Sequence, residues 1–171
     1  LMVLRAEALR HVDGKALCKA LHHAQHQPVE PIRRAHGRQR LHAERVLWLH
    51  HGGLERDDTD AHIDTLARFA PNNTIVYGEG SEEMLEELKS FRTLKGEPYR
   101  LVAVPPYYAN FLIMNGAILL PFYEDPNENQ RAKEALEVAF PDREVIGIDC
   151  SILLTQNGSL HCCTMQYPES E

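Results

Sequence analysis

One acidic stretch of this 171-residue sequence carries residue types that suit acid–base chemistry. It runs from Asp57 to Asp64 and contains five ionisable side chains, the last two being His62 and Asp64. Residues two apart on a strand point to the same face, so we expect His62 and Asp64 to lie side by side. A histidine next to a carboxylate suits proton transfer beside a cationic ligand. The alternative interpretation is a solvated acidic loop that leads into a strand with one exposed histidine.

A second candidate is the pair of adjacent cysteines, Cys162 and Cys163, which follows the turn signal Asn157-Gly158. A cysteine at the end of a strand and after a turn can present a nucleophile to a cleft, and the thiolate is its reactive form. The thiolate needs a positive neighbour that lowers the thiol pKa. The alternative is that both cysteines are small buried hydrophobic residues, which is the commoner fate of a free cysteine.

Histidines are concentrated near the start of the chain, where eight of the ten lie between His11 and His51. A metal site is one interpretation of the seven residues His22, His23, His26, His36, His42, His50 and His51. However, no cysteine or carboxylate with zinc-ligand spacing accompanies them, and the surrounding residues lack the periodicity of a strand or helix that would hold ligands. We therefore do not expect a metal site in this stretch.

The elements that would position these side chains can be read from residue 44 onward. Apolar or β-rich runs bounded by turn residues predict strands, and apolar residues repeated on one face predict helices. The predicted strands are 45–49, 62–69, 74–77, 99–104, 145–148, 151–154 and 159–166, with a hairpin in 113–120 that turns at Asn115-Gly116. The predicted helices are 82–91, with Ser81 as its N-cap, and 128–140, which Pro141 ends. A strand–strand–helix–strand unit recurs in this order, so the sequence predicts an α/β fold.

The composition excludes several classes of protein. Hydrophobic residues make up 43% and charged residues 25%, which are values typical of globular proteins. The net charge of −7 argues against generic nucleic-acid binding. No apolar run approaches the roughly 18 residues of a membrane span, and Arg5 and Glu7 interrupt the apolar start, unlike in a signal peptide. The four cysteines fit neither zinc spacing nor a dense disulfide framework, so we expect a reduced, cytoplasmic protein without membrane or nucleic-acid partners.

The two ends of the chain differ in composition. Residues 1–50 carry nine Lys and Arg against four Asp and Glu, whereas residues 51–171 carry nine against twenty-one. Residues 21–40 are crowded with His, Gln, Arg and Pro and have little apolar periodicity, so they have little to bury in a core. We therefore divide the chain into an atypical N-terminal segment, 1–43, which we expect to be poorly ordered, and a patterned part, 44–171.

Taken together, the patterned stretches resemble the agmatine deiminase family, which includes the Porphyromonas-type peptidylarginine deiminases. The resemblance extends from about residue 45 to residue 168, and the matching blocks keep the family's order and separation. They are Trp48–Gly52, Asp57–Phe69, Ala139–Val145 and Gly158–Gln166.

The resemblance implies a pentein fold, which is an α/β-propeller of strand–strand–helix–strand blades, and this chain would be a partial pentein whose N-terminal blades are missing. It implies hydrolysis of a guanidinium group to a ureido group with release of ammonia; agmatine would give N-carbamoylputrescine, on a route to putrescine. The family's nucleophilic cysteine falls on Cys162, its histidine on His62 and its guanidinium-binding aspartate on Asp64. The resemblance implies neither a metal nor a cofactor.

This sequence departs from the family pattern in three places. Cys163 stands where the family has an aliphatic residue. The N-terminal portion that carries further active-site carboxylates is absent or altered, and Glu7 is out of register, so no role is transferred to it. Codons can be chosen for parts of residues 5–43 such that translation in a shifted reading frame gives a sequence like that of the family. We therefore hypothesise that much of this segment is translated out of frame.

The sequence therefore predicts a guanidine deiminase that acts on the small molecule agmatine, with peptidyl-arginine deimination and a truncated inactive remnant as the alternatives. Because half of the guanidinium clamp is absent, we expect little or no turnover from the isolated chain unless a separate N-terminal half completes it. Association into a homo-oligomer is the other arrangement left open.

Overall fold

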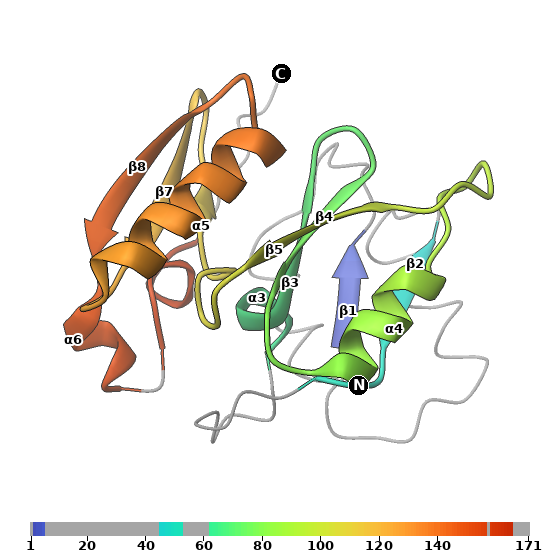
Figure 1. The fold of residues 1–171 in the computed structure, drawn as a ribbon, viewed down its shortest axis with the longest axis horizontal. Helices are drawn as coiled ribbons and strands as arrows, with labels where there is room; N and C mark the ends of the chain where they lie inside the picture. Colours follow the sequence, from blue (N-terminus) through green and yellow to red (C-terminus); the bar gives the residue numbers. More distant parts are fainter. Residues whose placement is uncertain (1, 6–44, 53–61, 157, 166–171) are drawn as a thin grey trace.

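Two repeated units and a pair of strands make up the part of the chain that the computed structural model describes, residues 2–5, 45–52, 62–156 and 158–165 (Figure 1). The first unit contains β3 (Ala67–Ala70), β4 (Thr74–Gly78), α4 (Glu82–Ser90) and β5 (Arg100–Val104). The second contains β6 (Leu112–Ile113), β7 (Ala117–Phe122), α5 (Pro126–Ala139) and β8 (Glu144–Asp149). In both units the first two strands are antiparallel, and the third joins parallel to the second after the helix. The predicted α/β fold with a recurring strand–strand–helix–strand unit is confirmed.

The strand pair consists of β1 (Met2–Arg5) and β2 (Val46–Leu49), which run antiparallel with Met2 opposite Leu49. β2 packs against α4, and its residues Leu47 and Leu49 are buried. β1 belongs to segment 1–43, for which we expected poor order. The rest of that segment, from residue 6, lies outside the described residues, so both the domain division and the out-of-frame hypothesis stay predictions.

Each long helix begins at a side chain that accepts hydrogen bonds from its first free amides. Ser81 Oγ accepts from the Met84 amide at the start of α4, as predicted. Asp125 caps α5 by accepting from two amides, and Pro126 occupies the first helical position, where its missing N–H costs nothing. α5 therefore starts two residues before the predicted Glu128.

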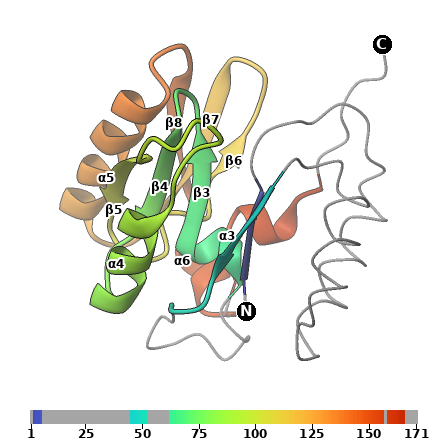
Figure 2. The same cartoon turned by 90° about the vertical axis from the view of Figure 1, so that its right-hand side faces the viewer.

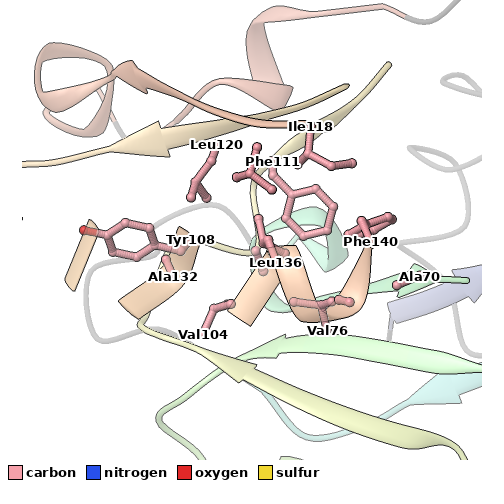
Figure 3. Close-up of a cluster of buried hydrophobic side chains, with 13 residues drawn as sticks. Ala70, Val76, Val104, Tyr108, Phe111, Ile118, Leu120, Ala132, Leu136 and Phe140 are labelled. Carbon is pink, nitrogen blue, oxygen red and sulfur yellow. The ribbon is translucent and has the colours of Figure 1, made fainter. Parts of the chain in front are cut away.

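The core joins the two units through α5. In Figure 3, Ala132 and Leu136 of this helix lie between the strands of the two sheets, and Val76 of β4 belongs to the same cluster. Phe111 and Phe140 meet edge to face with ring centroids 5.6 Å apart. A second cluster of buried side chains lies within the first unit, where β3, β4 and α4 pack with α3 and β2. Figure 2 shows that α4 and α5 lie on the same side of the two sheets.

Three segments predicted as strands contain short helices instead. They are α3 (Ile63–Leu66), α6 (Ser151–Leu154) and the 3₁₀ turn η1 (His161–Cys163). Within the predicted strand 62–69, only residues 67–69 form a strand, as part of β3. The prediction that His62 and Asp64 share one face of a strand is therefore wrong, because His62 precedes α3 and Asp64 lies in its first turn.

Side-chain bonds to the backbone explain these differences. The Thr65 amide and hydroxyl both donate to the His62 carbonyl, which closes the turn of α3. Asp149 Oδ1 accepts from the Ser151 amide and hydroxyl at the start of α6. The Thr164 hydroxyl and amide donate to the His161 carbonyl and close η1.

In the described part of the chain, no helix is both long and apolar enough to cross a membrane.

Candidate active site

Cys162 lies in η1, after the second unit, and its side chain is exposed. Its Sγ lies 3.3 Å from Asn110 Nδ2, which donates to it, and 3.6 Å from Asp64 Oδ2. Cys163 is exposed as well, so the alternative that both cysteines are buried hydrophobic residues is wrong. Among the cysteines in the described residues, Cys150 is buried, with only 1% exposed.

Asp64 faces the thiol from the first turn of α3 and accepts several hydrogen bonds through one oxygen. Its Oδ2 lies 2.8 Å from His161 Nδ1 and 3.1 Å from Asn110 Nδ2. Both sequence candidates, Asp64 and Cys162, are thus brought together although they are 98 residues apart in the chain.

Asn110 joins these two residues, and sequence reasoning missed it. It is fully buried, its amide donates to both Asp64 and Cys162, and its Oδ1 accepts the His161 amide at 2.8 Å. The repeat supplies a signal that could have found it. Asn110 stands two residues before β6, which is nearly the place that Asp64 occupies, three residues before β3.

Arg68 lies on β3, within the block 57–69 that matches the family, but the resemblance assigns no role to it. Its guanidinium donates to the Phe111 carbonyl at 2.9 Å and lies 5.2 Å from the centre of the Phe111 ring. The contact holds the segment that carries Asn110 against β3. Burial lowers the pKa of Arg68, while the charge of Asp64, and that of Cys162 when it is ionised, oppose this change. The guanidinium remains charged, as arginine does in proteins.

The local charges favour an ionised Asp64 and a protonated Cys162. Burial acts to raise the pKa of the Asp64 carboxyl, but the hydrogen bond and charge of His161, with the charges of Arg68 and His62, outweigh it and hold the pKa below its usual value. Burial raises the pKa of the Cys162 thiol; the Ser159 amide opposes this, and the charge of Asp64 raises it further. These residues therefore place a carboxylate next to a thiol.

His62 lies beside this group without a direct bond to it. Its backbone is extended at the N-cap of α3, and its imidazole is close enough to contribute to the lowered pKa of Asp64. Among the described residues, its ring has no hydrogen-bond partner. The other residues of the acidic stretch, 57–61, lie outside the described part.

The loop that carries Cys162 is tied to the second unit by a tyrosine. The Tyr123 hydroxyl lies 2.7 Å from the buried Ser159 hydroxyl and 3.4 Å from the Tyr107 carbonyl. Tyr107 has a φ of 73°, which is rare for a residue other than glycine, and precedes Asn110 by three positions. Backbone strain of this kind persists only where surrounding contacts hold it. Tyr123 thus links the two segments that meet at the thiol.

Two residues of the histidine-rich set have a different role from metal binding. The Nδ1 atoms and the backbone amides of His50 and His51 all contact the Glu87 carboxylate of α4 at 2.6–3.1 Å. The other five histidines lie outside the described residues. Within the described part, no group of three or more His, Cys, Asp or Glu side chains is arranged to hold a metal ion.

Known proteins are similar to this chain in sequence. The family model for the Porphyromonas-type peptidyl-arginine deiminases matches residues 32–168. Agmatine deiminase of Pseudomonas fluorescens is 27% identical over 209 residues, which cover 92% of this chain and 55% of that protein.

Solved structures give the same result. A candidate arginine deiminase from Porphyromonas gingivalis is 48% identical with a TM-score of 0.71, covering 77% of this chain and 45% of that one. A Cys-to-Ser variant of C. jejuni agmatine deiminase with substrate bound is 31% identical with a TM-score of 0.71, covering 84% of this chain and 48% of that one. The chain spans about half the length of the relatives it matches. With these matches over most of its residues, the chain belongs to the Porphyromonas-type peptidyl-arginine deiminase family, which has agmatine deiminases among its relatives.

Proposed function

We propose that this chain carries the nucleophile of a guanidine deiminase that hydrolyses agmatine to N-carbamoylputrescine and ammonia, on a route to putrescine. The observation that carries the proposal is the distance of 3.6 Å between Cys162 Sγ and Asp64 Oδ2. A flat cation held by this carboxylate lies within reach of this sulfur. The C. jejuni relative with bound substrate, an agmatine deiminase, supports the choice of substrate.

Substrate binding and nucleophile activation are coupled in this proposal. A guanidinium ion presents its N–H groups in a planar fork that a carboxylate accepts at both oxygens. Its positive charge next to Cys162 favours the thiolate and offsets the burial and the Asp64 charge that raise the thiol pKa. The protein's own groups thus keep the thiol protonated, and it becomes reactive when the substrate binds.

The chemistry then needs one proton carrier. The Cys162 thiolate attacks the central guanidinium carbon, which forms a C–S bond and a tetrahedral adduct. His62 donates a proton to the departing nitrogen, and the C–N bond breaks. Ammonia is released, and a thiouronium intermediate remains on Cys162. His62 then takes a proton from the water that attacks this carbon. The C–S bond breaks, the thiolate returns, and the ureido product is released.

Asn110 and Arg68 would act as positioning residues. Asn110 donates to both the carboxylate and the sulfur, so it sets their separation. Arg68 holds the neighbouring carbonyl of Phe111 and adds a buried positive charge near both. Neither residue needs to change its protonation state during the reaction.

The substrate could instead be an arginine within a peptide, which the description of the matching family favours. A third reading is a catalytically inactive remnant. The two units would be part of an α/β-propeller. Its other blades would correspond to the portion of the relatives that this chain does not span, and a separate N-terminal half could supply them.

The test is a colorimetric ureido assay on the full chain, with agmatine and with an arginine-containing peptide as substrates. We expect slow formation of N-carbamoylputrescine that Cys162→Ala abolishes and that the matched Cys163→Ala retains. A faster reaction with the peptide would move the proposal to peptidyl-arginine deimination. Product from neither substrate, together with no alkylation of Cys162 by 2-chloroacetamidine, would favour the inactive remnant.

A further inference from the structure

The carboxylate to which we assign the substrate is already occupied by a side chain of the protein. His161 Nδ1 lies 2.8 Å from Asp64 Oδ2, and the two side chains are 27% and 19% exposed. The backbone of His161 is fixed, because its amide meets both the side-chain and the main-chain oxygen of Asn110 at 2.8 and 3.3 Å. The imidazole can therefore leave Asp64 by side-chain rotation towards solvent without moving η1.

The two oxygens of Asp64 are used unequally. Oδ2 faces three donors, which are His161 Nδ1, Asn110 Nδ2 and the Cys162 thiol. Oδ1 has no hydrogen bond to any described residue. A guanidinium that binds bidentately needs both oxygens. The closest donor on Oδ2, His161, stands where one arm of the planar cation would lie, so the two compete.

Charge makes this competition depend on pH. Among the described residues, the titratable and charged groups around Asp64 are His62 and Arg68 on its own side and His161 and Cys162 on η1. When His161 is protonated, it and Arg68 place two positive charges beside the single negative charge of Asp64, which disfavours a further cation. Histidine as a residue type changes its charge between about pH 5 and 8, so pH is the variable that tests this competition.

We propose that His161 is a specificity-determining occupant of the guanidinium site: protonated, it pairs with Asp64 and excludes the cationic substrate, and neutral, it gives the carboxylate up. This inference rests on the proposed function, because it takes Asp64 as the residue that binds the cation. The imidazole then acts on substrate affinity and not on the bond-making steps.

Two probes of nearly equal shape isolate this effect. 2-Chloroacetamidine is a planar cation with the N–H fork of a guanidinium, and 2-chloroacetamide is its neutral counterpart. Both alkylate the Cys162 thiolate, with formation of an S–C bond and loss of chloride, and peptide mass spectrometry on the full chain gives the rate at this residue. Both rates are proportional to the fraction of Cys162 present as thiolate, so this fraction cancels in their ratio. The ratio therefore reports how well the site recognises the cation.

We expect the cation-to-neutral ratio of the wild-type chain to rise between about pH 5.5 and 8. In His161→Gln, which keeps a donor but not the charge, and in His161→Ala, the ratio at the lower pH should be about tenfold higher, the size expected when a hydrogen bond between charged groups no longer has to be broken. The rise with pH should also disappear. His62→Gln should keep the rise, and thermal melts of all variants establish that they fold.

The outcomes separate the two proposals. A wild-type preference for the cation that both His161 variants leave unchanged or reduce overturns the inference, because His161 would then orient Asp64 and not compete for it. A pH dependence that disappears in His62→Gln but persists in His161→Gln also overturns it. No preference for the cation in any chain at any pH overturns the cation-binding role of Asp64, and with it the proposed function.

Discussion

Replacing Asn110 by aspartate tests whether one buried amide sets the charge balance between the carboxylate and the thiol. Asn110→Asp keeps the size of the side chain and the oxygen that accepts the His161 amide at 2.8 Å. It removes the N–H groups that donate to Asp64 Oδ2 at 3.1 Å and to Cys162 Sγ at 3.3 Å. It also places a second carboxyl group within hydrogen-bond distance of Asp64.

The magnitude follows from these contacts. A hydrogen bond to a charged group is worth about 1.5–3 kcal/mol, and one pKa unit corresponds to about 1.4 kcal/mol. Loss of the donor to sulfur and addition of a negative charge both act against the thiolate, so we expect the thiol pKa to rise by at least about one unit. Alkylation of Cys162 at neutral pH should then slow by about tenfold or more.

The effect should also depend on pH in a definite direction. Two carboxyl groups this close share a proton at low pH, because like charges oppose a second ionisation. The shared proton restores a donor between residues 64 and 110, so the defect should be small in acid and grow as the pH rises. The assay is the rate of Cys162 alkylation by the neutral reagent iodoacetamide from about pH 5 to 9.

A matched control separates local charge from net charge. Asn115→Asp adds the same charge at the exposed turn between β6 and β7 and should leave the alkylation profile unchanged. If Asn110→Asp alkylates like the wild-type chain at every pH, while thermal melting shows a folded protein, Asn110 does not set the protonation state of the thiol.

Three further substitutions test the supports of the site and the fold. Tyr123→Phe removes the hydroxyl that ties the loop of η1 to the second unit, so alkylation of the candidate nucleophile should slow, whereas Tyr108→Phe, which loses only a bond to α5, should leave it unchanged. Glu87→Gln should lower the unfolding free energy in urea by about 1–3 kcal/mol, against nearly none for the exposed Glu86→Gln. Burial acts to raise the pKa of Glu87, but its bonds to two histidines lower it, so its contribution is present above its unfolded pKa and the difference should vanish as the pH falls below about 4. Gly147→Ala should cost about 1–3 kcal/mol in the same urea titration, because its Cβ would lie 2.3 Å from an aromatic ring of β7; an unchanged midpoint would show that the ring moves freely.

Apolar periodicity was enough to predict the long elements. Met84 and Leu88 of α4, and Ala132 and Leu136 of α5, are buried as their spacing indicated. The hairpin at Asn115-Gly116 joins β6 and β7 as predicted. These elements obey local rules because one face of each packs on the core.

The short elements could not be predicted in this way. α3, α6 and η1 each span a single turn, too short for a period to be counted. Their conformation depends on single side chains, such as Thr65 and Asp149, that bond to nearby backbone atoms. The same residue types are common in loops and at strand ends, so their presence alone does not predict a turn of helix.

The candidate site illustrates what a repeated fold adds to the information in a motif. The resemblance named Cys162 and Asp64, and motifs contain no signal for the fully buried Asn110 that joins them. All three residues lie outside the regular elements of the two units: Asp64 just before β3, Asn110 between β5 and β6, and Cys162 after β8. Junctions between units are where polar side chains from distant segments can meet, because the units themselves are filled by apolar packing. In a chain built from repeats, a polar residue at the position of a known site residue in another unit is therefore the place to look first.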